Sequence, residues 1–474
     1  MRRTHWKPAG LLGGLVLWMG AGCMSVGPDY RTPETAVPAA WQTPAGESAD
    51  TLAAWWTTFG DPALEALVAE TRARNKDLAA ATARMEAYAA AVGMARADWF
   101  PAVGAQGLAG SDRQSERVHT PEAYEATDNP GWLYQAGFSA SWELDLWGRV
   151  RRSVEAARGQ LESSQEDLRH LLVMLQAQVA AEYVGLRMNQ QRLAYAKENI
   201  ELQKETLQVV QGRFEAGLTG ELDVRQAEMN LAATTAQVPA LESKIAEALN
   251  ALCVLTGQLP GALDALREPG PVPAATALPG LLPTELLRRR PDVRSAERAL
   301  AAQTAKIGVA QADYFPALSL NGTFALAATD GGELFTSAAQ DFTVGPSLTW
   351  AIFNAGKIRN HVRAEEASTR AALSAYEKTV LAAYQECEDA LAAYGNEAKR
   401  LAALRDAAMA AEQSVELVNE LYRSGLANFQ NVLDMQRQRS SYQDALAQSQ
   451  GQSAANLVAV YKAFGGGWDA CGGR

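Results

Sequence analysis

The chain has 474 residues and a formal net charge of -11, with 48% hydrophobic and 20% charged residues. The acidic balance argues against nucleic acid as a partner, because proteins that bind nucleic acid need basic surfaces. The length allows several ordinary domains or one elongated architecture built from repeats. Much of the hydrophobic share is alanine, which together with Leu, Glu, Gln and Arg favours long helices.

Residues 1–22 have the parts of a secretory signal. Basic residues are followed by an apolar run from Leu11 to Met19 and by small residues before Cys23. The small residues and Cys23 resemble the lipobox of bacterial lipoproteins, although Gly20 stands where such boxes usually have Leu. We therefore expect a lipid on Cys23, and Met24 in place of Asp resembles lipoproteins sent to the outer membrane. A signal cut elsewhere, with Cys23 unmodified, is the alternative.

The sequence contains no recognisable catalytic or metal-binding motif. Cys253, Cys387 and Cys471 lie far apart and have no metal-ligand spacing. The four histidines have no Cys, His or carboxylate at ligand spacing, and no P-loop, GxSxG or HExxH motif occurs. We expect a protein that is not an enzyme and that holds no metal and no cofactor other than the lipid on Cys23.

A phrase of six residues occurs twice in the chain. ADWFPA covers 97–102 and ADYFPA covers 312–317, which places the two phrases 215 residues apart. Later matches, such as Trp142 with Trp350 and Gly217 with Gly425, lie 208 residues apart. The sequence therefore contains an internal repeat, with seven extra residues in a 107–131 surface loop of the first copy.

Both copies show the same order of expected elements. A helix at 61–97 or 284–312 runs into the repeated phrase, where proline stops it. Two strands, a very long helix, a glycine turn and a returning helix follow. We expect a lipidated extended segment at 23–60, the two copies at 61–258 and 284–464, a linker at 259–283 and a tail at 465–474. The joints between helix and strand are Phe100, Pro101, Phe315 and Pro316.

The expected strands alternate between apolar and polar residues. From Tyr134 to Leu146 the even positions are apolar and the odd positions are polar, and the segment from Phe342 to Ile352 has the same pattern. About ten alternating residues with aromatic ends suit an outer-membrane strand that faces lipid on one side. A strand of a soluble sandwich is the alternative. Glu143 and Asp145 belong to the polar face, where they would either line a lumen or form a solvated surface.

Heptad spacing predicts that the long helices form coiled coils. Apolar residues follow heptad steps from Val154 to Phe214, with one step of 11 residues between Leu175 and Leu186. Such a pattern gives a left-handed seam that a four-residue stutter relaxes locally. A helix of roughly 65 residues would be about 100 Å long. The two shorter helices of each copy would together match its length.

Several motifs together resemble the TolC-type outer-membrane efflux family, and specifically its NodT-like lipoprotein branch. They are VGPDYRTP at 26–33, WWTTFGDP at 55–62, the two ADxFP phrases, RRPDV at 289–293 and the glycine turns. The resemblance implies a mixed fold, in which a homotrimer builds a 12-stranded transmembrane β-barrel from four strands per chain. That barrel would continue into a long periplasmic α-helical coiled-coil barrel.

The resemblance also implies partners and sites. The partners would be a periplasmic adaptor (membrane fusion) protein, an inner-membrane pump of the resistance-nodulation-division type and outer-membrane lipid, with no nucleic acid. The turns that meet the adaptor would include Gly217, Leu218, Thr219, Gly425 and Leu426. An exposed Leu after each Gly favours a contact with a partner.

The gate of the family would match Gln430, Asp434 and Arg437. Asp434 would belong to an acidic ring at the periplasmic aperture, and Arg437 would help to keep that aperture shut. Since Gln430 stands where some relatives place Leu, we expect a polar latch rather than a hydrophobic constriction. The alternative is an ordinary surface pair, because Asp434 and Arg437 are three residues apart on a helix.

The expected function is the passive outer-membrane exit duct of a tripartite efflux system in a Gram-negative bacterium. The duct would be lipid-anchored, would extend into the periplasm and would conduct small molecules such as drugs, toxic compounds or metal ions. An exit duct for type I protein secretion uses the same architecture and stays an alternative. A periplasmic coiled-coil scaffold outside the membrane is a second alternative, but it gives no reason for two strands with exposed apolar faces.

Overall fold

The structure is a computed structural model, and it describes residues 25–35, 38–43, 52–112, 131–274, 278–280 and 282–468. Cys23, Cys471, the signal at 1–22 and most of the 107–131 loop lie outside these residues. The chain forms two compact units. Unit 1 comprises Met1–Pro33, Met85–Ser164 and Ala296–Tyr376, and unit 2 comprises Glu34–Arg84, Gln165–Ser295 and Glu377–Arg474.

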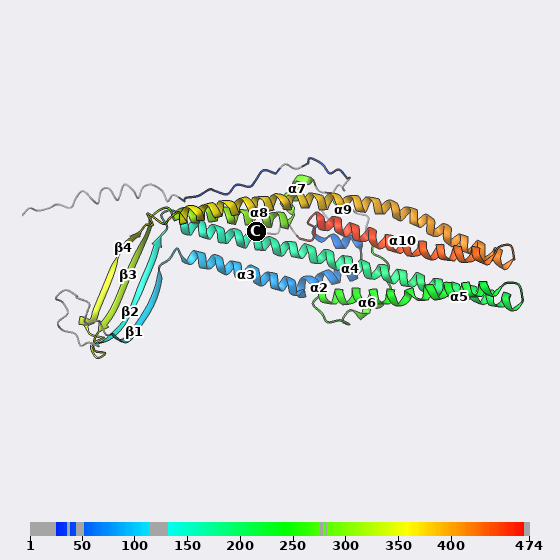
Figure 1. Ribbon diagram of the computed structural model, residues 1–474, viewed down its shortest axis with the longest axis horizontal. Helices are drawn as coiled ribbons and strands as arrows, with labels where there is room; N and C mark the ends of the chain where they lie inside the picture. The colour runs from blue at the N-terminus through cyan, green and yellow to red at the C-terminus, as the bar shows by residue number, and fades with distance from the viewer. Residues whose placement is uncertain are drawn as a thin grey trace, which may run out of the picture. The chain divides into compact units, whose positions relative to one another are not determined.

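Unit 1 contains an antiparallel sheet of four strands in the order β1-β2-β3-β4 (Figure 1). The strands are β1 (Ala102–Asp112), β2 (Gly131–Leu144), β3 (Ala317–Ala328) and β4 (Gln340–Thr349). Within one chain, β1 and β4 are therefore the edges, and each leaves a row of backbone N–H and C=O groups without a strand partner.

The sequence prediction places the start of the 107–131 loop too early, because strand β1 extends to Asp112. Each residue of β1 as far as Asp112 pairs with β2, and Asp112 lies opposite Gly131. The Gly- and Ala-rich sequence of this segment has little strand propensity. Pairing with the longer β2 overrides that local preference, so residues 107–112 are strand.

Apolar side chains of the sheet remain exposed, as the alternation predicts. Phe138 on β2 is 59% exposed, and Phe342 and Val344 on β4 are each 74% exposed. On the polar face, Ser141 Oγ donates to Asn321 Oδ1 at 2.9 Å and Asn321 Nδ2 donates to Ser347 Oγ at 3.0 Å. The sheet therefore has neutral hydrogen-bonded side chains on one face and apolar side chains on the other.

The helices provide the rest of the described fold (Figure 1). The two longest, α4 and α9, have 67 residues each, close to the roughly 65 expected from the heptads. Val154, Leu175, Leu186 and Ile200 of the predicted seam are buried, whereas Phe214 at its end is 44% exposed. The helical elements are η1 (Leu52–Phe59), α2 (Pro62–Arg74), α3 (Lys76–Ala97), α4 (Arg149–Glu215), α5 (Glu221–Thr235), α6 (Gln237–Leu255), η2 (Asp264–Arg267), α7 (Pro283–Arg289), α8 (Pro291–Ala312), η3 (Ser337–Ala339), α9 (Lys357–Arg423) and α10 (Phe429–Ala463).

The expectation of one continuous helix over 61–97 is wrong, because α2 and α3 are separated at Asn75. The Asn75 side chain accepts hydrogen bonds from the N–H groups of Asp77 and Leu78 and donates to Leu255 O at 2.9 Å. Asn75 therefore starts a new helix while it anchors the break to α6. The expected helix over 284–312 is likewise divided, at Pro291, which has no N–H to continue the ladder.

A buried ion network joins α8 to the end of α10 in unit 2. Arg290 donates to Asp292, to Glu386 and to the Ala463 carbonyl oxygen at 2.8 Å, and its side chain is only 7% exposed. Burial alone would raise the pKa values of Asp292 and Glu386, but Arg290 lowers both below their ordinary values. Arg290 is thus a charge that the unit can bury only because two carboxylates compensate it.

Cys387 and Cys253 are both free thiols and both are buried. Burial raises the pKa of the Cys387 thiol to about 12, and its Sγ lies 3.3 Å from the Ala463 carbonyl oxygen. Among the described residues, no helix is long and apolar enough to span a membrane.

Replacing Arg290 by Ala should destabilise unit 2 by about 3–5 kcal/mol, because Asp292 loses its cationic partner and Glu386 keeps only Lys462. Arg267→Ala is the matched control, since Arg267 and Asp264 form an exposed pair that should contribute less than about 1 kcal/mol. Thermal unfolding followed by circular dichroism measures both variants. Equal melting temperatures for Arg290→Ala and Arg267→Ala would contradict the network.

The contribution of Arg290 to the stability of unit 2 should also depend on pH. Carboxylates with lowered pKa values stabilise the fold above their unfolded pKa values, and they lose that contribution as the pH falls through the lower folded values. The ordinary values of Asp292 and Glu386 are 3.8 and 4.5. The difference between wild type and Arg290→Ala should therefore shrink below about pH 4.

Candidate functional site at the joints and the helical turns

The joints between helix and strand are built from the repeated phrase. After α3 the N–H of Phe100 donates to Ala97 O at 2.9 Å, and after α8 the N–H of Phe315 donates to Ala312 O at 3.1 Å. Pro101 and Pro316 follow directly, and β1 and β3 begin at the next residue. The four predicted joint residues therefore lie where both helices end and both strands begin.

Two tryptophans that correspond in the repeat hold the joints. Trp142 Nε1 donates to the carbonyl oxygen of Trp99 at 3.0 Å, and Trp350 Nε1 donates to that of Tyr314 at 3.1 Å. Each bond connects the end of one strand to the aromatic residue that precedes the neighbouring strand. The sequence matched the two tryptophans, but it gave no sign of these hydrogen bonds.

Glu143 and Asp145 form ion pairs at the transition from β2 to α4. Glu143 binds the Arg149 guanidinium, while Asp145 accepts from the N–H groups of Val150 at 3.1 Å and Arg151 at 3.0 Å. Asp145 thereby satisfies free N–H groups at a helix N-terminus, where negative charge is favoured. A lumen-facing position for both acids stays a prediction, and both charges already have cationic partners.

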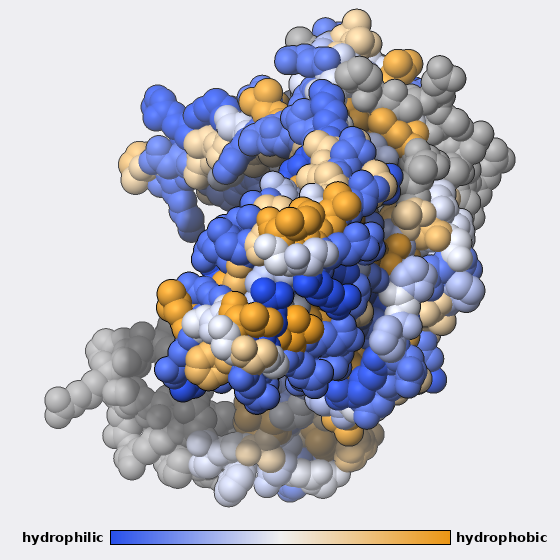
Figure 2. Space-filling model, turned by 90° about the vertical axis from the view of Figure 1, so that its right-hand side faces the viewer, coloured by the Kyte–Doolittle hydropathy of each residue, from blue (hydrophilic) through white to orange (hydrophobic). Residues whose placement is uncertain are grey.

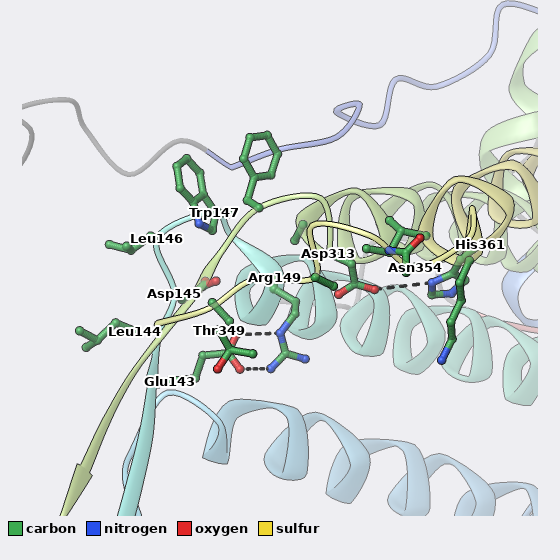
Figure 3. A pocket seen from close by; sticks show the side chains of 16 residues that line it. Glu143, Leu144, Asp145, Leu146, Trp147, Arg149, Asp313, Thr349, Asn354 and His361 are labelled. Atoms are coloured by element: carbon green, nitrogen blue, oxygen red, sulfur yellow. Dashed lines mark hydrogen bonds and ion pairs between the residues drawn. The ribbon is translucent and has the colours of Figure 1, made fainter. Parts of the chain in front are cut away.

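A cavity of about 450 Å³ lies at the joints in unit 1 (Figure 3). Trp147 stacks on Phe315 with ring centroids 4.6 Å apart, and its Nε1 donates to Pro316 O at 2.9 Å. Asp313 lies 3.7 Å from Nδ1 of His361. The charged residues that line the cavity are Glu143, Asp145, Arg149, Asp313 and Lys357, and His361 also lines it.

Several carboxylates at this cavity interact with the Arg149 guanidinium. A hydrogen bond to Glu143 is the largest cause that raises the pKa of Arg149, and the carboxylates of Asp313 and Asp98 also raise it. Asp98 and Asp313 are the aspartates of the two repeated phrases, so both copies contribute to one cationic centre. Within the described parts of the chain, no three His, Cys, Asp or Glu side chains are grouped to hold a metal ion.

The predicted gate residues lie on α10 in unit 2. Asp434 accepts a hydrogen bond from Gln430 Nε2 at 2.9 Å. Arg437 Nε donates to Asn230 Oδ1 on α5 at 3.3 Å. In the structure Asp434 and Arg437 thus have different partners, Gln430 and Asn230, and their role at a gate stays a prediction. Asn230 was not predicted, since its partner is 207 residues away.

The two helical turns end in the same geometry. Gly217 and Gly425 have φ values of +69° and +76°, which glycine adopts without strain. Leu218 N–H donates to Arg213 O and Leu426 N–H donates to Leu421 O, both at 2.8 Å. These bonds close the helix ends as in a Schellman motif, in which glycine occupies the left-handed position.

The turns also present apolar side chains to solvent. Leu218 is 66% exposed and Leu426 is 77% exposed, while Thr219 is bonded to Asp223. Figure 2 looks toward this end of unit 2 and shows separate apolar patches within a polar surface. Arg213 bridges the two turns, because it donates to Tyr422 O at 3.2 Å and its guanidinium carbon lies 4.7 Å from the Tyr422 ring centroid.

Comparisons with known proteins agree with this architecture. The chain matches the model of the family described as "Outer membrane efflux protein" over residues 67–258 and 282–466. It is 34% identical over 456 residues to the probable efflux pump outer membrane protein TtgC of Pseudomonas putida, covering 94% of this chain and 93% of TtgC. It is 31% identical over 470 residues to outer membrane protein OprJ of Pseudomonas aeruginosa, covering 98% and 97%.

Solved structures give the same result. The outer-membrane channel OprN superposes with a TM-score of 0.85 at 38% identity, covering 94% of this chain and 99% of OprN. The open state of the MtrE outer membrane channel of Neisseria gonorrhoeae superposes with a TM-score of 0.83 at 27% identity, with the same coverage.

The fold and these likenesses define an outer-membrane channel protein of efflux systems, which is a transport class and not an enzyme class. The chain belongs to the outer membrane efflux protein family. It acts in the outer membrane as the exit component for efflux, and the periplasmic scaffold is therefore excluded.

Proposed function

We propose that the chain forms a homotrimer that serves as the passive exit duct of a tripartite efflux pump. Three sheets of four strands would close into one transmembrane barrel of 12 strands, and the helices would form a periplasmic coiled-coil barrel. In this assembly the two sequence copies would become structural repeats around the duct. A periplasmic adaptor and an inner-membrane pump of the resistance-nodulation-division type would supply substrate and energy.

The sheet edges are the observation that carries this proposal. β1 and β4 each have one side without a strand partner within the chain, and large apolar side chains on the sheet are exposed. In lipid, each backbone N–H and C=O must find a protein partner. Pairing β4 of one copy with β1 of the next would satisfy both edges and leave the apolar face toward lipid.

Small molecules are the proposed cargo. The relatives include a toluene efflux pump outer membrane protein and an antibiotic efflux pump outer membrane protein, both of Pseudomonas putida. These names support small-molecule efflux over type I protein secretion. An exit duct passes on what its pump delivers, so we expect the pump to select the substrate.

The exposed leucines of the turns are proposed as the adaptor contact. Leu218→Asp combined with Leu426→Asp should abolish efflux, because charged groups would replace apolar contacts at the adaptor surface. Leu259→Asp is the matched control, since Leu259 is 82% exposed outside the turns. Complementation of a deletion strain should give at least tenfold greater antibiotic susceptibility with the double variant than with wild type or control.

Two results would contradict this proposal in different ways. Full complementation by the double variant, at normal levels in the outer membrane, would show that the turns do not bind the adaptor. A deletion strain with unchanged drug accumulation and a defect in secretion of one polypeptide would instead favour type I secretion.

The hydrogen bonds of α10 are proposed to hold the periplasmic gate closed. Three copies of Asp434 around a threefold axis would repel one another, so closure needs compensating donors. Gln430 already bonds to Asp434, and Arg437 ties α10 to Asn230 of α5. The latch is thus polar, and part of it lies within each chain.

Arg437→Ala should increase single-channel conductance in planar bilayers several-fold, because α10 loses its bond to α5. Asn230→Ala should give a similar increase, since it removes the same bond from the other side. Arg405→Ala on α9 serves as a control for loss of one positive charge. Unchanged conductance in both Arg437→Ala and Asn230→Ala would refute the latch.

Cys23 is proposed to carry a lipid that anchors the N-terminus to the outer membrane. Cys23→Ser should abolish incorporation of radioactive palmitate and weaken attachment to the membrane. Wild-type labelling of the Cys23→Ser variant would rule out this residue as the acceptor. Ser25→Ala, two positions along, is the matched control and should be labelled normally.

A further inference from the structure

Helix α3 has an exposed face that its counterpart in the second copy buries. In the sequence repeat, Ala87, Ala90 and Ala97 correspond to Ala302, Ala305 and Ala312 of α8. The three alanines of α8 are buried, whereas the three of α3 are exposed. The residues are identical, so the neighbours must differ.

The difference arises in part because α8 lies between two helices, and in part because the extended N-terminal segment of the same chain covers α8 at Gly308 and Glu297. On one side, Ala302 lies against Gly159 of α4, where a Cβ on the glycine would come within 2.9 Å of the Ala302 methyl. On the other side, Gln303 Nε2 donates to Glu365 Oε2 of α9 at 2.6 Å. In the repeat, α9 corresponds to α4 and α3 corresponds to α8. Since α8 packs against α4, its counterpart α3 would pack against the counterpart of α4. That counterpart is helix α9.

The chain's own α9 is already held against α8, so the missing α9 has to come from another molecule. Two glycines support the comparison. A Cβ on Gly308 of α8 would come within 2.8 Å of Arg152 of α4 and of Val26 in the N-terminal extended segment, but a Cβ on its counterpart Gly93 of α3 would meet nothing within 4 Å. The face of α3 that contains Gly93 is thus open within one chain.

Charges on the two helices are complementary. Arg149 of the first copy shares a cavity with Asp313 of the second. Their counterparts in the repeat are Lys357 and Asp98, and both residues are exposed. The Lys357 amine has no ion pair among the described residues, and Ala351 stands where the corresponding strand end of the first copy has Glu143.

A second pair follows from another cavity of unit 1. Glu162 of α4 and Ala301 of α8 line it together. Their counterparts are Arg370 of α9 and Glu86 of α3. The acidic Glu162 of α4 is thus replaced by the basic Arg370 on α9. The neutral Ala301 of α8 is replaced by the acidic Glu86 on α3.

We propose that a second copy of this chain packs the segment Lys357–Arg370 of its α9 against α3. In this interface, Lys357 of the second copy lies beside Asp98, and Arg370 of the second copy lies beside Glu86. The inference rests on the proposed assembly of several copies and identifies the residues through which unit 1 of each copy recognises the next.

Cysteine cross-linking of the full-length chain in detergent tests the interface. Asp98→Cys combined with Lys357→Cys, treated with a short bis-maleimide, should give a covalent trimer as the main band on a denaturing gel. Each chain carries both positions, so the links close a ring. The native Cys253 and Cys387 are buried, and each single variant reports any background from native thiols.

A mismatched pair on the same two helices is the matched control. In Glu86→Cys combined with Lys357→Cys, the α3 position moves 12 residues, or about 18 Å, along the helix. This pair should give monomers only. Cross-linking of the mismatched pair as efficient as that of the matched pair would overturn the proposed register.

Charge exchange provides a second measurement. Lys357→Glu and Asp98→Lys should each reduce the yield of trimer several-fold, because like charges then face each other across the interface. The two changes together should restore that yield, which no independent folding defect would do. Additive losses in the double variant would overturn the pairing.

Native mass spectrometry separates failure of this interface from failure of the proposed function. A trimeric mass for the matched cysteine variant, with only monomers after cross-linking, would overturn the interface and leave the channel proposal intact. A monomeric mass for the wild-type chain would overturn the trimer itself and this inference with it.

Discussion

The backbone of the four-stranded sheet imposes the main constraint on this protein. A membrane offers no water to unpaired N–H and C=O groups, and each one left exposed to lipid costs several kcal/mol. Three internal strand pairs satisfy most of these groups, but the outer sides of β1 and β4 remain. The proposed homotrimer would pair these outer sides with those of neighbouring copies and would place the exposed apolar faces toward lipid.

The joints follow from the same constraint. Each sheet strand is attached to a helix, and the chain has to change from helical to strand geometry without leaving buried polar groups free. Proline ends helical pairing, and Trp142 and Trp350 use their indole N–H groups to satisfy carbonyl oxygens at the joints. Asp145 does the same for N–H groups at the start of α4. These local solutions allow one chain to join two kinds of secondary structure at four places.

Much of this architecture could be predicted from the sequence because its signals are periodic. Heptads predicted the 67-residue helices and alternation predicted β2 and β4. The break at Asn75 was missed. The hydrogen bonds by which Asn75 caps α3 are local, but its anchor on Leu255 lies 180 residues away. The bond between Arg437 and Asn230 likewise depends on how α10 packs on α5. Glycine-rich β1 was partly missed because pairing, rather than propensity, makes it a strand.

The repeat explains why the two copies have diverged in charge. The contact between α4 and α8 forms within one chain, where the connecting residues keep the two helices at high effective concentration. The corresponding contact between chains has no such tether, and alanine faces alone would pack in several registers. Charged groups such as Asp98 and Lys357 disfavour the wrong registers, because a shifted helix leaves them unpaired or beside like charges. The first copy can accordingly keep its acids at the strand end, where Arg149 pairs with Glu143 and Arg151 pairs with Asp145. The second copy replaces these acids by Ala351 and Phe353 and leaves Lys357 available for a neighbour.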